Sequence, residues 1–294
     1  MCYSINKKLL NFLVTGITSL LFYTASSAQT TTYSSLLWEV SGNGLQQPSY
    51  LYGTFHLVCP DDLVISPVIS GKIQSSKKLF LEMDMDDPSV MIKVQQGMML
   101  TDSSWKDLLS EKEYNALADS FQKITQMPIG MMTRIKPFAL VSIITMGIMK
   151  CPMASWDLAL AQKAKDNNIE IKGLESPERE LEAINMISLK DQTDMLKDML
   201  LNADSCKKAM DKMMDMYKRR DLKGLTEEIK NDKSFGMLED ELLDKRNAEW
   251  APVIEKQITT EPTFFAFGAG HLVGDSGIIS LLKKRGYTVK PVKY

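Results

Sequence analysis

Residues 263–271 read Thr-Phe-Phe-Ala-Phe-Gly-Ala-Gly-His, a β-branched and aromatic run that ends in two glycines and a histidine. A second stretch, Tyr50 to His56, has the same form and ends in Gly-Thr-Phe-His. Together they contain both histidines of the chain. Glycine lets a backbone turn without a side chain in the way, and α/β folds place their ligands at the carboxyl ends of strands. We therefore expect two strands that direct both imidazoles into one crevice.

The remaining pattern predicts strands near the two ends of the chain and helices between them. Helical spacing covers 61–76, most of 89–168 and 177–256, and 278–284. Short apolar runs predict the strands, at 36–40, 50–56, 78–83, 170–174, 263–267 and 288–292. This order predicts an α/β fold with a large helical insertion at about 88–260.

Composition excludes several classes of protein. The 294 residues are 44% hydrophobic and 24% charged, which rules out a disordered chain, a collagen and a small disulfide scaffold. The formal net charge of −2 gives no electrostatic reason to expect a nucleic-acid partner.

The first 28 residues have the features of a secretory signal peptide. Lys7 and Lys8 precede a mainly apolar run from Leu9 to Tyr23, and small residues lead up to Ala28. The alternative is an uncleaved anchor helix, but the run is shorter than the ~20 apolar residues that a membrane span needs. We expect cleavage after Ala28 and an exported, periplasmic or extracellular single domain, 29–294, with no stable membrane anchor.

Three cysteines remain after such cleavage, namely Cys59, Cys151 and Cys206. Exported proteins meet oxidising conditions, which favour disulfides. Cys59 and Cys151 each lie beside a proline in a predicted loop, whereas Cys206 lies in a lysine-rich helical stretch. We therefore predict a Cys59–Cys151 disulfide.

Glu82 is the strongest candidate for a third functional group. It follows an apolar strand, where a charge is costly unless it is used or paired. Paired imidazoles can bind a metal, act as acid and base, or be buried polar groups with partners, and a metal would need a further ligand such as Glu82. A salt-bridged strand end is the alternative for this residue, and spacing alone leaves both open.

Twenty methionines are concentrated in the predicted helices. They could form an adaptable groove for an apolar or peptide ligand, or they could fill a helical core. We expect the core.

The motifs and their order resemble one family over nearly the whole mature chain. The chain is similar to the TraB/PrgY/GumN family, which includes the Tiki proteases. The matching stretches are 37–40, 48–56, 80–88, 136–138, 173–176, 246–247, 268–274 and the tail from 277 to 292.

This resemblance implies a mixed central sheet built as two related halves, each with one Gly-x-x-His. It also implies a relationship to the erythromycin esterases and to ChaN-like haem-binding lipoproteins. Tiki-like members imply a divalent metal, manganese or cobalt, with zinc as a further possibility. By the same resemblance His56, Glu82 and His271 form the metal site, Arg246 and Asn247 lie beside it, and Arg134 and Glu175 lie at its rim.

Three functions are compatible with these sequence features. The first is an exported metal-dependent hydrolase, a peptidase acting on a peptide or protein, in which Glu82 ligates or takes a proton and Arg246 stabilises an oxyanion. The second is a non-catalytic periplasmic protein that binds a metal, haem or peptide. The third is an esterase-like hydrolase with a histidine base. Neither Gly-x-Ser-x-Gly nor His-Glu-x-x-His occurs in the chain.

Overall fold

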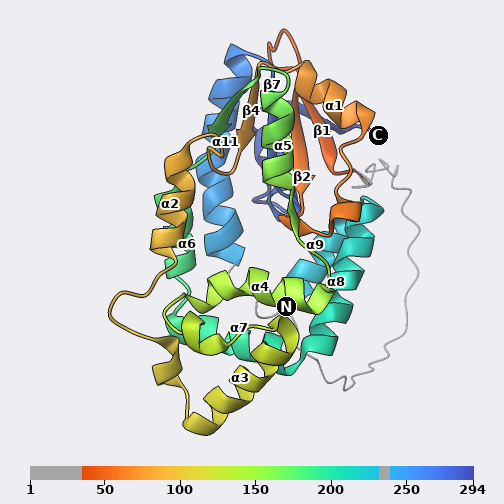
Figure 1. The fold of residues 1–294 in the computed structure, drawn as a ribbon. Coiled ribbons are helices and arrows are strands. Elements are labelled where there is room, and N and C mark those ends of the chain that lie inside the picture. The colour runs from red at the N-terminus through yellow and green to blue at the C-terminus, as the bar shows by residue number, and fades with distance from the viewer. Residues whose placement is uncertain (1–34, 232–238) are drawn as a thin grey trace, which may run out of the picture.

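A computed structural model describes residues 35–231 and 239–294, and the predicted signal peptide lies outside these residues. Figure 1 shows a sheet half above a helical half. Six strands form the central sheet in the order β6-β4-β7-β2-β1-β8. Their bounds are Leu37–Ser41 (β1), Ser49–Thr54 (β2), Lys78–Leu81 (β4), Glu170–Gly173 (β6), Thr263–Gly268 (β7) and Thr288–Pro291 (β8). The predicted α/β fold with a mixed central sheet is confirmed.

Four adjacent strands of this sheet run in the same direction. β2 pairs in parallel with β7, and β4 pairs in parallel with both β7 and β6. β1 is antiparallel to its two neighbours, β2 and β8. The carboxyl ends of β6, β4, β7 and β2 therefore meet at one edge, which is turned towards the helical half (Figure 1).

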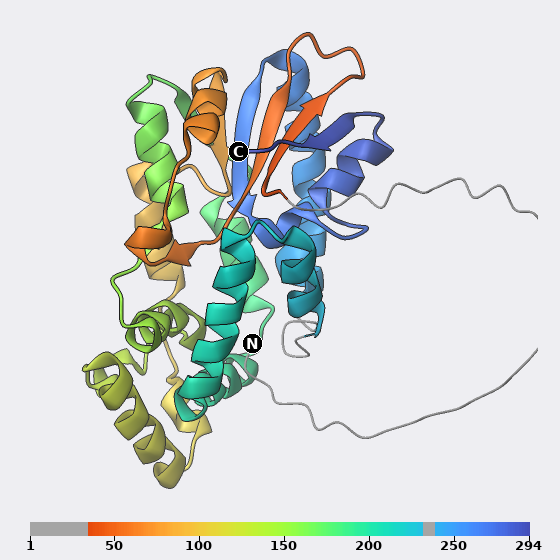
Figure 2. The ribbon, with the colours of Figure 1, turned by 90° about the vertical axis from the view of Figure 1, so that its right-hand side faces the viewer.

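Helices cover both faces of the sheet. α1 (Pro67–Gln74) and α5 (Trp156–Lys165) lie on one face, and α11 (Lys245–Thr260) and α12 (Ile278–Lys284) lie on the other (Figure 2). β2 and β7 are buried along their whole length. Parallel strands that are covered on both faces have continuous apolar sequences, because neither face meets water. This explains the aromatic sequence of β7.

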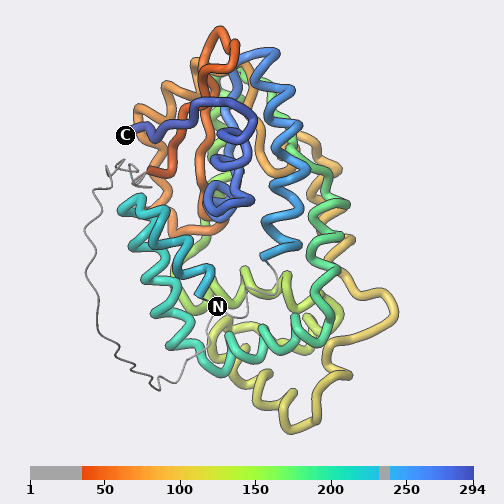
Figure 3. The backbone as a smooth tube through the Cα atoms, turned by 180° about the vertical axis from the view of Figure 1, so that it is seen from behind, coloured from red at the N-terminus to blue at the C-terminus, as the bar shows by residue number. Residues whose placement is uncertain are grey.

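The helical half has a hydrophobic core of its own, centred on Trp105, Phe121, Leu140 and Leu196. Figure 3 shows its helices from behind, most of them below the level of the sheet. They are α2 (Pro88–Gly97), α3 (Glu111–Thr125), α4 (Pro137–Met149), α6 (Pro177–Asn185), α7 (Leu189–Leu201), α8 (Ala203–Lys218) and α9 (Leu222–Asn231). Within 88–260, α5, β6 and α11 belong instead to the sheet half. In the part of the chain that the structure describes, no helix has the length and hydropathy needed to cross a membrane.

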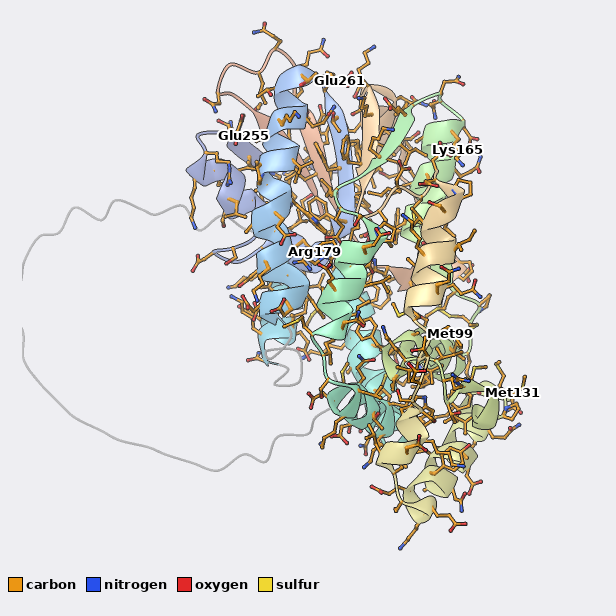
Figure 4. All side chains as sticks on the ribbon, turned by 90° about the vertical axis from the view of Figure 1, so that its left-hand side faces the viewer. Met99, Met131, Lys165, Arg179, Glu255 and Glu261 are labelled. Atoms are coloured by element: carbon orange, nitrogen blue, oxygen red, sulfur yellow. A yellow bond between two sulfur atoms is a disulfide. The ribbon has the colours of Figure 1, made fainter. Side chains whose placement is uncertain are left out.

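The prediction that methionine fills the helical core is wrong for most of these residues. Among the described methionines, only Met199 and Met214 are buried, and five more pack against the two hydrophobic cores while partly exposed, namely Met85, Met132, Met210, Met213 and Met216. Met99 and Met131 lie on the surface of the helical half (Figure 4), with 46% and 80% of their surfaces exposed. Leucine, isoleucine and aromatic side chains supply the core instead, because their shapes fill it at lower conformational cost.

The predicted disulfide between Cys59 and Cys151 is confirmed and closes a loop of 92 residues. It joins the segment after β2 to the segment that follows α4. A two-stranded ribbon lies beside it, in which β3 (Leu57–Val58) pairs antiparallel with β5 (Ala154–Ser155). Disulfide and ribbon together connect the two halves of the molecule next to His56.

Removing this disulfide should destabilise the protein. We expect the double variant Cys59→Ala, Cys151→Ala to lose about 2–5 kcal/mol of unfolding free energy, because the unfolded chain regains the entropy of an open loop. Urea unfolding followed by circular dichroism measures the loss. Cys151→Ala alone should lose a similar amount, and an unchanged midpoint in both variants would contradict this role.

Candidate active site

The predicted site residues gather at the shared carboxyl edge of the four parallel strands, with the exception of Arg134. His56 follows β2, Glu82 follows β4, Glu175 follows β6, and His271 lies in the turn Ala269–Leu272 after β7. Ligands bind at this edge in open α/β sheets, because loops diverge there and leave a crevice. Parallel pairing thus brings together residues that are far apart in the sequence.

Gly268 marks the point where the two histidines and Glu82 converge. A methyl group on its Cα would lie 3.1 Å from Nε2 of His56, 3.4 Å from Oε1 of Glu82 and 3.6 Å from Cδ2 of His271. Gly268 pairs with Thr54 in the register of β2 and β7, so the two motifs end side by side. The predicted convergence of both histidines is confirmed, and the absence of a side chain on Gly268 leaves the space between them open.

Arg246 connects Glu82 to Glu175 at the centre of the site. Its Nη2 lies 2.6 Å from Oε2 of Glu82 and 2.7 Å from Oε1 of Glu175, and its Nε donates to both oxygens of Glu175 at 3.1 Å. Its Nη1 donates to the carbonyl of Leu242 at 3.1 Å. The three charged side chains are almost fully buried, with 3–8% of their surfaces exposed. Trp250 donates from Nε1 to Oε2 of Glu175 at 2.9 Å and completes the set.

Glu82 is held as a carboxylate. Burial alone would raise its pKa, but the charges of Arg246 and His56 and the hydrogen bond from the Gly268 N–H, at 2.7 Å, bring its pKa far below the ordinary value. Glu82 therefore forms the salt bridge that was one of the two expectations for it, with Arg246 as its partner. The same carboxylate also faces His56. Its Oε1 lies 3.7 Å from Nε2 of His56.

The two histidines occupy contrasting environments. His271 is buried, and burial lowers its pKa to about 3, so that its ring is neutral at physiological pH. Its Nδ1 lies 2.8 Å from Oδ1 of Asn247, and its Nε2 lies 3.5 Å from Nη1 of Arg246. His56 has 61% of its side-chain surface exposed. Desolvation opposes its protonation, but the charges of Glu82 and Asp157 prevail and raise its pKa.

The structure adds two carboxylates that sequence analysis missed. Asp157, in the first turn of α5, has Oδ2 3.6 Å from Nδ1 of His56, and its Oδ1 is buried without a hydrogen-bond partner. Glu180, on α6, also has a buried oxygen without a partner. Burial, followed by the charge of Glu82, raises the pKa of Glu180 to about 7. Asp157 and Glu180 lie in sequences typical of helix N-termini, so no local sequence pattern distinguishes them as site residues.

The expected rim residues differ in position. Glu175 is inside the site and is bound to Arg246. Arg134 lies in the helical half, between the turn Ile129–Met132 and α4, where its exposed guanidinium donates to the carbonyl of Thr101. The structure thus brings together His56, Glu82, Glu175, Arg246, Asn247 and His271, and leaves Arg134 outside this cluster.

The nitrogen and oxygen atoms of this cluster are of the chemical types that bind divalent cations. Imidazole nitrogens and carboxylate oxygens are the ligands that manganese, cobalt and zinc share. Unpartnered buried oxygens of Thr54, Asp157 and Glu180 add capacity for a cation or a hydrogen-bond donor. Across residues 35–231 and 239–294, however, no three acidic, histidine or cysteine side chains are already grouped as a metal site.

Comparison with known proteins places the chain in a family. The model of the TraB/PrgY/gumN family matches residues 36–291, and the chain belongs to this family. Metalloprotease TIKI1 of Danio rerio is 23% identical over 87% of this chain and 63% of its own length. Metalloprotease TIKI2 of Danio rerio is 22% identical over 87% of this chain and 61% of its own length.

A third relative, the Metalloprotease TIKI homolog of Nematostella vectensis, is 22% identical over 89% of this chain and 68% of its own length. The chain therefore spans less than two thirds of the length of the two Danio rerio relatives. No solved structure was found to match the chain.

Replacing Arg246 by leucine should cost about 3–5 kcal/mol of unfolding free energy, because it leaves two buried carboxylates without a counter-charge. Arg179→Leu is the matched control: Arg179 pairs with Glu249 at 2.7 Å, but that carboxylate is half exposed, so its loss should cost about 0–1 kcal/mol. Urea unfolding at neutral pH measures both values. Equal losses in the two variants would contradict the central role of Arg246.

Replacing Glu180 by glutamine should stabilise the metal-free protein only at high pH. Between the ordinary glutamate pKa of 4.5 and about 7, unfolding releases the proton that native Glu180 holds, so wild-type stability falls as pH rises. Glutamine avoids this loss. We expect a gain of about 1–3 kcal/mol above pH 7 and none below pH 4.5, measured by thermal unfolding. Exposed Glu182→Gln is the control, and a gain that does not change with pH would refute the assignment.

Proposed function

We propose that this protein is an exported metal-dependent hydrolase that cleaves peptides or proteins. The observation that carries the proposal is the space beside Gly268, which is bounded by Nε2 of His56, Oε1 of Glu82 and the ring of His271. Membership of a family with metalloprotease-named relatives supports the same class of reaction. A nucleic-acid partner is not part of the proposal.

His56, His271 and Glu82 would hold the metal, with manganese or cobalt preferred and zinc as an alternative. Such an ion lowers the pKa of a bound water and polarises a carbonyl. The neutral state of His271 favours ligation, because a metal needs an imidazole nitrogen with a free electron pair. Asn247 supports this arrangement, since its Oδ1 accepts from Nδ1 of His271 and leaves Nε2 without a proton.

The contacts of Arg246, Glu82 and His56 favour holding charge and metal over moving protons. Arg246 has its donors engaged by Glu82, Glu175 and the Leu242 carbonyl, which favours fixing the carboxylates over binding a developing oxyanion. Glu82 is a weak base because its pKa is far below the usual range, so ligation suits it better than proton transfer. His56 lies on the open side of the site, where it would hold the metal within reach of substrate and water.

Export is proposed from the first 28 residues, with cleavage after Ala28 and a periplasmic or extracellular location. The Cys59–Cys151 disulfide is consistent with an oxidising compartment.

Metal binding and peptide cleavage should be measured together on residues 29 to 294. The protein is purified free of metal, supplied separately with manganese, cobalt, zinc or haem, and tested on a peptide library. We expect metal-stimulated cleavage that falls by at least about 100-fold in His56→Ala, Glu82→Ala and His271→Ala, since each removes a ligand or its charge. Gly268→Ala should also inactivate the protein, because its methyl group occupies the space between the three side chains.

Gly71→Ala, in α1, is the control for the glycine variant, because the added methyl group meets no atom within 4 Å. It should bind metal and cleave peptide as the wild type does. Tight binding of metal or haem without cleavage would instead favour the non-catalytic binding protein. Cleavage that persists without metal would favour an esterase-like hydrolase with a histidine base.

A further inference from the structure

Each imidazole of the site faces an oxygen on its outer side. Nδ1 of His271 faces Oδ1 of Asn247 at 2.8 Å, and Nδ1 of His56 faces Oδ2 of Asp157 at 3.6 Å. The opposite nitrogen, Nε2, faces the central ion-pair cluster in both cases: Glu82 at 3.7 Å for His56 and Arg246 at 3.5 Å for His271. Asp157 therefore occupies, for the first histidine, the place that Asn247 occupies for the second.

The β3–β5 ribbon brings Asp157 to His56. β3 begins at Leu57, directly after His56, and pairs with Ser155, two residues before Asp157. The Cys59–Cys151 disulfide closes the same ribbon from the other side. Short ribbons are marginal by themselves, and a covalent bond at their end fixes their register. His56 and Asp157 are thus held opposite each other although 100 residues separate them in sequence.

The carboxylate of Asp157 has spare hydrogen-bonding capacity. It lies in the first turn of α5, where the partial positive charge of the helix N-terminus favours an anion. Its Oδ1 is buried and has no hydrogen-bond partner, and only 18% of the side chain is exposed. A buried oxygen without a partner costs stability, so its retention beside an exposed histidine points to a role in the site.

We propose that Asp157 is a positioning residue for His56: it accepts a hydrogen bond from Nδ1–H and so directs an unprotonated Nε2 towards Glu82. The inference deepens the proposed function, because it assumes that Nε2 of His56 works in the site. At 3.6 Å the contact is longer than a hydrogen bond, and such contacts in active sites shorten when the site is engaged. The neutral Asn247 would perform the same task for His271.

Two histidines in the chain make the test simple to read. Nitrogen NMR of ¹⁵N-histidine-labelled protein distinguishes protonated from unprotonated ring nitrogens, and the His56→Gln variant assigns the signals. At alkaline pH, where the ring of His56 is neutral, we expect a proton on Nδ1 in the wild type. Asp157→Leu and Asp157→Ala should shift His56 to a mixture of both tautomers. Asp157→Asn should restore the wild-type pattern, since its amide oxygen still accepts a hydrogen bond.

Manganese or cobalt titration followed by calorimetry provides a second readout. Asp157→Leu should weaken the affinity by about 10–100-fold, the usual effect of removing a partner of a metal-bound histidine, and Asp157→Asn should weaken it less. Asp166→Asn, at the other end of α5, is the charge control, because Asp166 is exposed and contacts Gln162. It should alter neither readout.

The tautomer measurement separates this inference from the proposed function. If the wild type binds no metal but Asp157→Leu still changes the His56 tautomer, the positioning role stands and the metal-dependent reaction is wrong. An unchanged tautomer in both Asp157→Leu and Asp157→Ala would overturn the positioning role, whatever the metal affinity.

Discussion

The parallel pairing of β2 with β7 is the constraint on which the site depends. In this register Thr54 lies opposite Gly268, so both Gly-x-x-His segments leave the sheet at the same level. A shift of one residue would turn every side chain of a strand to the other face, which two fully buried strands do not allow. The register is therefore fixed by side-chain packing on both faces of the sheet, and the spatial relationship of the two histidines follows from it.

The close approach of the segments after these strands adds a second constraint. A side chain on Gly53 would lie 2.7 Å from Cδ1 of Leu272 and 3.1 Å from the backbone of Ala269. Glycine at this position allows the turn after β7 to pack directly on β2. Tyr217, on α8, then donates to the Gly53 carbonyl at 3.2 Å and connects the helical half to the same point. The first motif thus contributes to packing as well as to the candidate site.

Electrostatics explains why a buried cluster of charges persists in the site. Replacing a buried ion pair by apolar side chains is often neutral or stabilising, so stability alone does not account for Arg246 and its two carboxylates. The cluster holds Glu82 ionised beside two histidines. His271 is buried and neutral, whereas His56 is exposed and has a raised pKa. Groups whose environments separate their protonation states in this way are typical of active sites.

The sequence by itself determined the strands at both ends, their order as an α/β fold, the disulfide and the meeting of both histidines at one sheet edge. These features depend on local apolar patterns, on glycine and on the small number of cysteines and histidines.

Only the tertiary structure decided which carboxylates join them. Asp157 reaches His56 through a ribbon closed by a distant cysteine, and Glu180 is one of several acidic residues on α6. Tertiary structure also placed Arg134 outside the cluster and left most of the described methionines only partly buried or exposed. Burial and charge proximity depend on contacts between distant segments, which local sequence patterns do not encode.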